Sequence, residues 1–396
     1  MRHALEGSQA LARAVALCRP QVVAAYPITP QTHIVENIAR LVADGDLKAQ
    51  LVSVESEFSA ASVVLGSVAA GSRSYTATSS QGLLLMAEVL FNIAGLRLPL
   101  VMTCANRAIS APLSIWNDQQ DSMSVRDAGW IQLYCADNQE AVDTTIQAFR
   151  ISEACELPVM VCVDGFTLTH TLEVLDLPEP AQVDAFLSPF KFSRRLDSAD
   201  PLSVGTLVSP DFYTEARYDH HQALLDSIDV IETAQRDWSA ISGRAGSGLL
   251  AVEGRPDATR GILSIGSITG TLQVAMEEAG AADATRLIRL RCFRPFPAEA
   301  LRKACAGLEE LIVLERAFSP GAGGIVGVEV RAALSEMANP PRVYNFSVGL
   351  GGRDVPMTAF ASLLDAVRNG RGATFDMLDL EPDRLPQERA AAGGAR

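Results

Sequence analysis

The chain has 396 residues, of which 48% are hydrophobic, and a formal net charge of −14 with a pI near 4.9. This length exceeds what one compact core usually holds, so we expect two domains. The acidic balance argues against a nucleic-acid-binding protein, which needs a basic surface stripe. Arginine supplies nearly all the positive charge, because only Lys48, Lys191 and Lys303 are lysines. Any carboxylate-binding clamp is therefore expected to use arginine.

Apolar runs are all shorter than the roughly twenty residues that a membrane span needs, and no signal-peptide pattern opens the chain. We therefore expect a cytoplasmic protein that does not bind membranes. The seven cysteines are scattered and form no C-x-x-C pair. This pattern predicts buried reduced thiols, with neither a zinc ion nor an iron–sulfur cluster held by this chain alone.

Short apolar runs alternate with segments of helical period through residues 10–166, which predicts βαβ units around a parallel sheet. The expected strands are residues 22–25, 51–54, 74–77, 98–104 and 158–163. The expected helices are residues 7–18, 31–43, 57–70 and 79–94. Residues 105–130, between the last two strands, are polar and aromatic, and such a long loop at a strand end is typical of a functional segment.

The second half predicts another α/β unit. Residues 172–200 have the composition of an extended connector, and a polar helix with a break is expected over 211–241. Strands are then expected at 261–265, 286–290, 310–315 and 343–346, and helices at 269–279, 297–305, 324–335 and 357–367. The predicted division is a first domain over 1–241, a linker over 242–257, a second domain over 258–370, and a mobile or partner-docking tail over 371–396.

Two prolines follow the first predicted strand of the chain, residues 22–25. Pro27 and Pro30 cannot continue a regular ladder, so Thr29 is held in an extended loop at the carboxyl end of the strand. Ligands bind at that edge in open α/β sheets. A purely structural loop is the alternative.

Glu57 follows the next strand and opens a helix of small residues. Its carboxylate could act as a partner for the helix dipole, or as a buried acid that shares a proton with a ligand nitrogen. Glu55, two residues earlier, is the competing carboxylate.

Two further strand ends carry polar groups. The hydroxyls and backbone N–H groups of Thr78 to Gly82 suit ligand contact or ordinary N-capping. Arg107 follows an apolar strand, and its guanidinium suits bidentate capture of a planar carboxylate such as that of a 2-oxo acid. The alternative for Arg107 is a structural salt bridge to Asp118, Asp121 or Asp127.

Taken together, these segments resemble the α subunit of the thiamine-diphosphate-dependent 2-oxoacid oxidoreductases, the pyruvate:ferredoxin oxidoreductase family. The resemblance covers nearly the whole chain in order, except the tail after about residue 370. The segments that carry it are Tyr26–Pro30, Ser56–Glu57, Ala77–Gly82, Ala105–Ala108, Ile115–Ser122, Gly129–Gln132, Pro210–Glu215, Arg294–Pro297 and Gly349–Asp354.

This resemblance implies an α/β fold in which a thiamine-diphosphate pyrimidine-binding domain, a parallel sheet with helices on both faces, precedes a transketolase C-terminal-like domain. It implies that Glu57 is the catalytic acid that hydrogen-bonds the cofactor's aminopyrimidine ring. It also implies that Thr29 and Arg107 hold the substrate, with Arg107 pairing to its carboxylate. Ile28 and Asn106 are further expected substrate contacts, and Pro27, Ser80 and Gln81 further expected cofactor contacts.

The implied reaction is oxidative decarboxylation of a 2-oxo acid to an acyl-coenzyme A, with pyruvate as the default substrate. A branched-chain acid or an aryl acid such as phenylglyoxylate is the alternative substrate. The chain lacks the Gly-Asp-Gly signature for the diphosphate and Mg²⁺, because Val163 replaces the first glycine. This absence fits the split form of the family, in which other chains complete the enzyme.

The expected partners are a β subunit with the diphosphate and Mg²⁺, a γ subunit, and a δ subunit with [4Fe–4S] clusters, in a dimer of the heteromer. The electron acceptor is ferredoxin, or NAD through a flavin subunit. Two other functions stay open: a non-redox decarboxylase or transketolase-like subunit, and a catalytically silent scaffold.

Overall fold

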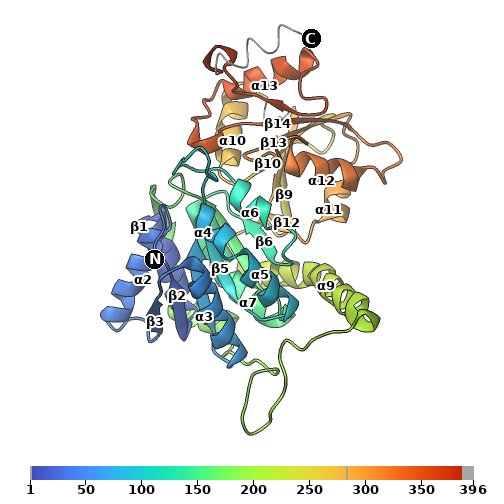
Figure 1. Ribbon diagram of the computed structural model, residues 1–396. Coiled ribbons are helices and arrows are strands. Elements are labelled where there is room, and N and C mark those ends of the chain that lie inside the picture. Colours follow the sequence, from blue (N-terminus) through green and yellow to red (C-terminus); the bar gives the residue numbers. More distant parts are fainter. Residues whose placement is uncertain (1, 282–283, 386–396) are drawn as a thin grey trace.

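The computed structural model of the chain describes residues 2–281 and 284–385 and consists of two α/β units stacked on each other (Figure 1). The first unit is built on a seven-stranded sheet in the order β12-β6-β7-β5-β4-β2-β3. Its neighbours are parallel, except that β12 runs antiparallel to β6. The strands are β2 (Val22–Ala25), β3 (Gln50–Ser53), β4 (Ser74–Thr78), β5 (Val101–Asn106), β6 (Ile131–Tyr134), β7 (Val159–Asp164) and β12 (Cys292–Arg294).

Helices cover both faces of this sheet, which confirms the expected fold class. Alternate strand residues point to opposite faces, so Met102 and Cys104 pack into one apolar cluster while Val101 and Ala105 pack into the other. One face is covered by α3 (Glu57–Ala69), α4 (Ser80–Leu85) and α5 (Ala87–Gly95). The opposite face is covered by α1 (Gly7–Leu17), α2 (Thr32–Ala43), α7 (Asn138–Cys155) and α9 (Pro210–Ser242).

The second unit has a six-stranded sheet in the order β15-β14-β13-β10-β11-β9, with only the edge strand β9 antiparallel to its neighbour. Its strands are β9 (Leu250–Glu253), β10 (Arg260–Ile265), β11 (Thr285–Leu290), β13 (Glu310–Glu315), β14 (Arg342–Ser347) and β15 (Asp376–Met377). Helices α11 (Ala298–Ala304) and α12 (Ile325–Leu334) pack on one face, and α10 (Ile268–Glu278) and α13 (Ala359–Arg368) on the other.

The predicted linker and tail need correction. Residues 242–257 contain β9, which pairs with β11, so this segment belongs to the second sheet. In the tail, β15 pairs with β14, and residues 386–396 lie outside the described part. The units are also interlocked, because β12 comes from the second half of the chain and extends the first sheet.

Other differences concern local elements. The predicted 79–94 helix is two helices that meet at Met86, and α9 runs without the predicted break. The predicted connector begins with β8 (Leu172–Asp176), which pairs with β1 (Arg2–Glu6) in a separate two-stranded sheet and precedes α8 (Pro180–Phe186). The long loop after β5 contains the short helix α6 (Gln120–Ser124). Six of the seven cysteines are buried and none forms a disulfide, as expected.

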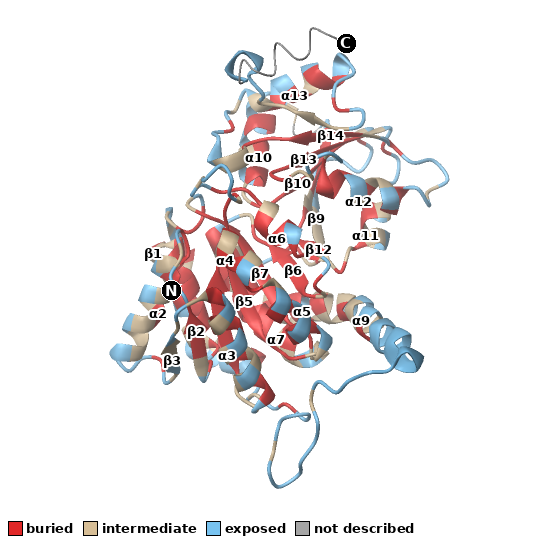
Figure 2. Ribbon diagram, viewed as in Figure 1, coloured by how far each residue is buried: buried red, intermediate tan, exposed pale blue. Residues whose placement is uncertain are grey.

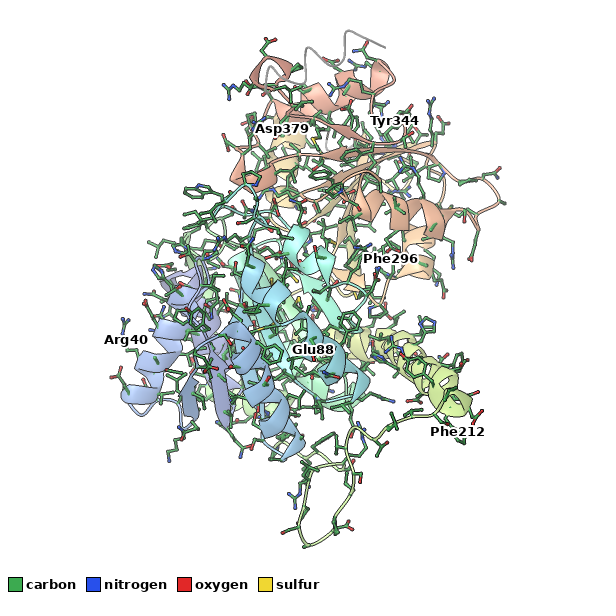
Figure 3. All side chains as sticks on the ribbon, in the orientation of Figure 1. Arg40, Glu88, Phe212, Phe296, Tyr344 and Asp379 are labelled. Atoms are coloured by element: carbon green, nitrogen blue, oxygen red, sulfur yellow. The ribbon has the colours of Figure 1, made fainter. Side chains whose placement is uncertain are left out.

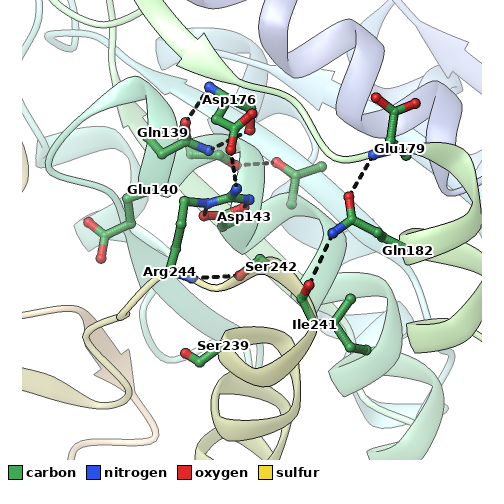
Figure 4. Close-up of polar contacts among 12 residues, drawn as sticks. Gln139, Glu140, Asp143, Asp176, Glu179, Gln182, Ser239, Ile241, Ser242 and Arg244 are labelled. Atoms are coloured by element: carbon green, nitrogen blue, oxygen red, sulfur yellow. Dashed lines mark hydrogen bonds and ion pairs between the residues drawn. The ribbon is translucent and has the colours of Figure 1, made fainter. Parts of the chain in front are cut away.

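Burial is concentrated in the strands of both sheets, whereas the segment that leads into α9 and the first part of α9 are exposed (Figure 2). Phe212 lies at the projecting end of this helix, away from both sheets (Figure 3). The other end is fixed to the first unit: Arg244 donates to Asp143 of α7 and to Asp176 of β8, and Gln182 donates to the Ile241 carbonyl (Figure 4). No helix of the described residues is long and apolar enough to cross a membrane.

Candidate functional site

The strand order of the first sheet places a topological switch point between β2 and β4, and the carboxyl edge there is the expected ligand crevice. The chain leaves β2 toward β3 on one side, and it leaves β4 toward β5 on the other. In open α/β sheets, ligands bind at the carboxyl edge at such a switch point. Helix α3 follows β3 and packs over β2 and β4, so its first residue, Glu57, lies at this edge together with the two loops.

Glu57 is buried, with 6% of its surface exposed, and its carboxylate forms no hydrogen bond with any described residue. A Cβ atom on Gly82 would lie 2.6 Å from Oε1 of Glu57 and 2.6 Å from Oγ1 of Thr78, so a glycine is needed for the close approach. Ser56 caps the helix, accepting a hydrogen bond from the Ser59 N–H at 3.2 Å. The helix start thus already has its cap, and a dipole partner would not need to be buried in this way.

The competing carboxylate lies elsewhere. Glu55 is exposed and accepts a hydrogen bond of 2.5 Å from the hydroxyl of Ser59. Glu57, and not Glu55, is therefore the buried acid at the start of α3.

Buried polar atoms without partners accompany Glu57. Thr78 Oγ1, Ser79 Oγ and Gln81 Nε2 are buried and have no hydrogen-bond partner among the described residues. Ser79 is the N-cap residue of α4, but its side chain does not cap the helix, so the N-cap alternative does not account for it. Burying a polar group without a hydrogen bond is costly. This set of unsatisfied groups beside a carboxylate fits a polar ligand such as an aminopyrimidine ring.

Ser80 is held in a strained conformation with φ +49°, in the left-handed region that non-glycine residues rarely adopt. Its N–H donates to Oδ2 of Asp121 at 2.9 Å, and its hydroxyl lies 2.5 Å from the Ala108 carbonyl oxygen. The hydroxyl is therefore engaged in joining the two loops. Of Ser80 and Gln81, both predicted to contact the cofactor, Gln81 is the better placed, because its Nε2 has no partner among the described residues.

Asp121 ties the strand ends together. Besides Ser80, it accepts hydrogen bonds from the backbone N–H of Arg107 at 2.9 Å and from Nδ2 of Asn106 at 2.8 Å. Burial raises the pKa of the Asp121 carboxyl group to about 6, although these hydrogen bonds favour its charged form. The carboxylate holds the loops after β4 and β5 in one arrangement.

Arg107 is the second exceptional charged group. Its guanidinium is buried, donates from Nη1 to the Thr29 carbonyl at 2.9 Å and from Nε to the Ser114 carbonyl at 3.1 Å, and forms no ion pair with any described carboxylate. Burial lowers the pKa of Arg107, and the charge of Asp121 opposes this effect. The predicted alternative, a structural salt bridge, is wrong. The two neutral backbone carbonyls instead fix the orientation of the Arg107 guanidinium, which remains able to bind an anion.

The remaining predicted contacts differ in their exposure. Thr29 and Pro27 are exposed at the end of β2, and Ile28 is half-buried. Asn106 is fully buried, and both of its amide hydrogens have partners in Asp121 and Ser122, at 2.8 and 2.7 Å. Asn106 therefore supports the loop from inside, which makes a direct substrate contact through its amide hydrogens unfavourable.

Sequence reasoning missed two residues that position the site. Gln31 is buried and donates from Nε2 to the Ala77 carbonyl at 3.0 Å, and its Oε1 accepts from the Ile28 N–H at 3.3 Å, so it joins the ends of β2 and β4. Asp121 was considered only as an ion-pair partner. The available signal was a polar side chain directly after Pro30, and an acid inside a loop that leads into a short helix.

The second unit supports the same edge. Asp164, at the end of β7, accepts from the Ser267 N–H at 2.9 Å and from Gln119 Nε2 at 3.0 Å, and it lies 3.6 Å from Nη1 of Arg316. Gly352 donates to the Asn117 carbonyl at 2.7 Å. The loop that carries Arg107 is thus fixed from both sides.

Comparison with known proteins identifies the family of the chain. Residues 13–236 match the family model of the pyruvate flavodoxin/ferredoxin oxidoreductase thiamine diphosphate-binding domain, and residues 258–360 match the pyruvate:ferredoxin oxidoreductase core domain II. The chain is 46% identical over 354 residues to pyruvate synthase subunit PorA of Methanothermobacter thermautotrophicus, covering 89% of this chain and 91% of the relative. It is 39% identical over 376 residues to ketoisovalerate oxidoreductase subunit VorA of Pyrococcus abyssi, covering 93% and 94% of the two chains.

A solved structure shares the fold. The 2-oxoglutarate:ferredoxin oxidoreductase from Magnetococcus marinus, with 2-oxoglutarate, coenzyme A and succinyl-CoA bound, superposes with a TM-score of 0.69 at 20% identity. The match covers 93% of this chain but 65% of that one, so the solved chain is longer than this one. On the strength of both family models and the two close relatives, the chain belongs to the thiamine-diphosphate-dependent 2-oxoacid oxidoreductases, as an α subunit.

Proposed function

We propose that this chain binds the pyrimidine end of thiamine diphosphate and the carboxylate of a 2-oxo acid, within a heteromeric enzyme that decarboxylates the acid oxidatively to an acyl-coenzyme A. One observation carries the proposal. Glu57 and Arg107 are both buried, neither pairs with an opposite charge among the described residues, and both belong to the same sheet edge. An unpaired buried charge is costly, and a ligand that supplies its partner removes that cost.

Thiamine diphosphate, when bound, supplies the carbon nucleophile and the electron sink for decarboxylation. Glu57 holds a proton against a ring nitrogen, and Thr78, Ser79 and Gln81 satisfy the other polar atoms of the ring with groups that have no partner in the protein. Arg107 binds the substrate carboxylate, and its two bonds to backbone carbonyls fix the plane in which it does so. The exposed Thr29 and the half-buried Ile28 contact the substrate from the end of β2.

Pyruvate is the proposed substrate. A carboxylate clamp is common to all 2-oxo acids, so the side chain must be selected by the apolar surroundings, of which Ile28 is the nearest candidate. A relative named for ketoisovalerate is still 39% identical to this chain, against 46% for the relative named for pyruvate, so a branched-chain acid is the main competitor.

The enzyme is proposed to be complete only with partner chains that hold the diphosphate with Mg²⁺ and the iron–sulfur clusters, and that pass electrons to ferredoxin or NAD. Exposed apolar side chains near the crevice support a partner surface there. They are Tyr26, Phe58, Leu113, Ile115 and Trp116. Surface of this kind beside a binding site commonly marks a protein interface.

A glutamine substitution at Glu57 tests the proposal. In the assembled enzyme, with 2-oxo acid, coenzyme A and methyl viologen, Glu57→Gln should lower turnover by about 10²-fold to 10⁴-fold, the usual contribution of a positioned acid or base. Glu55→Gln, in the exposed carboxylate two residues earlier, is the matched control and should leave turnover unchanged. Full viologen reduction by Glu57→Gln would refute the proposal, and an iron-free active complex would favour a non-redox enzyme.

A further inference from the structure

A cluster of three metal-ligating side chains lies outside the site described above. Glu6 ends β1, His33 is in the first turn of α2, and His170 lies in the turn that follows β7. One ligand atom of each side chain lies within 4.8 Å of the other two. None of the three contacts Glu57 or Arg107 through a hydrogen bond, so the cluster has no part in the proposed reaction.

The cluster is already drawn together without an ion. Nδ1 of His33 lies 2.9 Å from Oε1 of Glu6, and the ring centroids of His33 and His170 are 4.6 Å apart. An ion pair between partly exposed groups contributes little, about 0–1 kcal/mol. It also does not account for the second imidazole, whose ring is tilted by 34° to that of His33 and which forms no ion pair with a described carboxylate. A cation between the three would use all three side chains.

Neighbouring hydroxyl groups orient two of the ligands. The Ser8 hydroxyl donates to Oε1 of Glu6 at 2.6 Å, and the Thr169 hydroxyl lies 2.7 Å from Nδ1 of His170. Metal-ligating histidines typically use their other ring nitrogen for such a hydrogen bond, which fixes the ring and its tautomer. We therefore expect Nε2 of His170 to face the ion.

The donor set selects a class of ion. Two imidazoles and one carboxylate suit Zn²⁺ and its first-row neighbours, whereas Mg²⁺ and Ca²⁺ prefer oxygen ligands. Zinc bonds to nitrogen and oxygen are about 2.0–2.2 Å long, so the three ligand atoms must approach to roughly 3–4 Å of one another. The side chains of His33 and Glu6 are 46% and 28% exposed, which gives them room for that small movement.

We propose that Glu6, His33 and His170 form a site for one divalent transition-metal ion of the Zn²⁺ class, with water at the remaining coordination position. The ion would join β1, α2 and the turn after β7, three segments that are far apart in the sequence. The ring of Phe166 lies 4.7 Å from that of His170 and 4.6 Å from that of Trp116, so the site also adjoins the loop that carries Arg107. The cysteine pattern could not indicate this site, because its ligands are histidines and a glutamate with no local spacing.

Metal titration of the full chain tests this proposal. After treatment with a chelator, the protein is titrated with ZnCl₂ by isothermal calorimetry and, separately, with CoCl₂ by visible absorption. We expect one saturable equivalent and a tetrahedral-type Co²⁺ spectrum. His170→Gln and Glu6→Gln should each weaken Zn²⁺ binding by at least about 10- to 100-fold, the loss seen when even an outer-shell partner is removed.

His221→Gln is the matched control, because His221 is an exposed histidine on α9, outside the cluster. It should bind Zn²⁺ like the wild type. Thermal melts of the apo forms show that each variant folds. The absence of a saturable equivalent in the wild type, or an equal loss of binding in His221→Gln and His170→Gln, would overturn the assignment.

Discussion

Replacing Arg107 with lysine isolates what its guanidinium contributes. Lysine keeps the positive charge but replaces a rigid fork of five donors with a compact ammonium group on a flexible stem. The two hydrogen bonds to the Thr29 and Ser114 carbonyls, 2.9 and 3.1 Å long, hold the fork in place, and one ammonium cannot reproduce both together with a bidentate contact to substrate.

The size of the expected effect on kcat/KM follows from the burial of the Arg107 guanidinium. Arg107 is 7% exposed and has no carboxylate partner in the described protein, so a bound substrate carboxylate would form a buried, hydrogen-bonded charge pair with it. Disrupting one side of such a pair costs about 2–5 kcal/mol, which corresponds to a decrease of about 30-fold to several thousand-fold in kcat/KM. Because lysine keeps the charge, the decrease in kcat/KM for Arg107→Lys should be near the lower limit, about 30-fold. It should arise chiefly from a higher KM.

Arg286 provides a matched control. It is 5% exposed, and its guanidinium likewise donates to backbone carbonyls, those of Ala304 and Ala306, without an ion pair to any described carboxylate. It lies on β11 in the second sheet. Arg286→Lys should lower the melting temperature without raising KM for the 2-oxo acid.

The assay is steady-state viologen reduction by the assembled enzyme over a range of 2-oxo acid concentrations, with melting curves for each variant. An unchanged KM in Arg107→Lys, or equal KM increases in both variants, would refute the assignment of Arg107 to the substrate carboxylate.

Three other changes test the supporting geometry. Gly82→Ala would place a Cβ 2.6 Å from Oε1 of Glu57, so it should abolish turnover and lower the free energy of unfolding by about 1–3 kcal/mol. The control is Gly66→Ala in α3, where an added Cβ meets no atom within 4 Å. In chemical denaturation this variant should be neutral or stabilise the protein by up to about 1 kcal/mol. The folded-state pKa of Asp121, about 6, lies above its unfolded value, so its contribution to stability is largest below pH 4 and is lost as the pH rises to 6. The stability of wild type relative to Asp121→Asn should therefore fall by about 2 kcal/mol between pH 4 and pH 6.5, and a constant difference would contradict this. Asp164→Ala removes the acceptor for Ser267 and Gln119 and leaves Arg316 unpaired, so it should cost about 3–5 kcal/mol, and calorimetry should then show separate transitions for the two units.

Sequence alone predicted the elements whose signals are local. The strand that ends in two prolines, the small-residue helix that begins at Glu57 and the apolar central strands need no distant partner to be recognised. The same holds for the placement of Thr29, Glu57 and Arg107 at one sheet edge, because the carboxyl ends of parallel strands share that edge.

Elements that depend on distant partners were missed. Helix α7 lies between the sheet and α9, and distant partners engage its polar side chains: Arg150 pairs with Asp237 of α9, and the buried Thr144 and Gln147 accept hydrogen bonds from Arg291. Strand β12 has three residues and exists only because β6 offers it an edge. Three residues are too few for β12 to show a periodic pattern in its own segment.

The role of Arg107 could not be decided from sequence for a similar reason. Three acids follow it within the same loop, and any of them could have neutralised it. In the fold, the Asp121 carboxylate instead accepts hydrogen bonds from backbone N–H groups, including that of Arg107 itself, and so stabilises the loop rather than the guanidinium. A buried acid and a buried base that face one crevice would gain by pairing with each other or with their neighbours. Here neither group pairs with an opposite charge: Glu57 packs closely on Gly82, and Arg107 donates to two backbone carbonyl groups. Burying two unpaired charges costs free energy, and such an arrangement is typical of a site where a bound ligand supplies the missing partners.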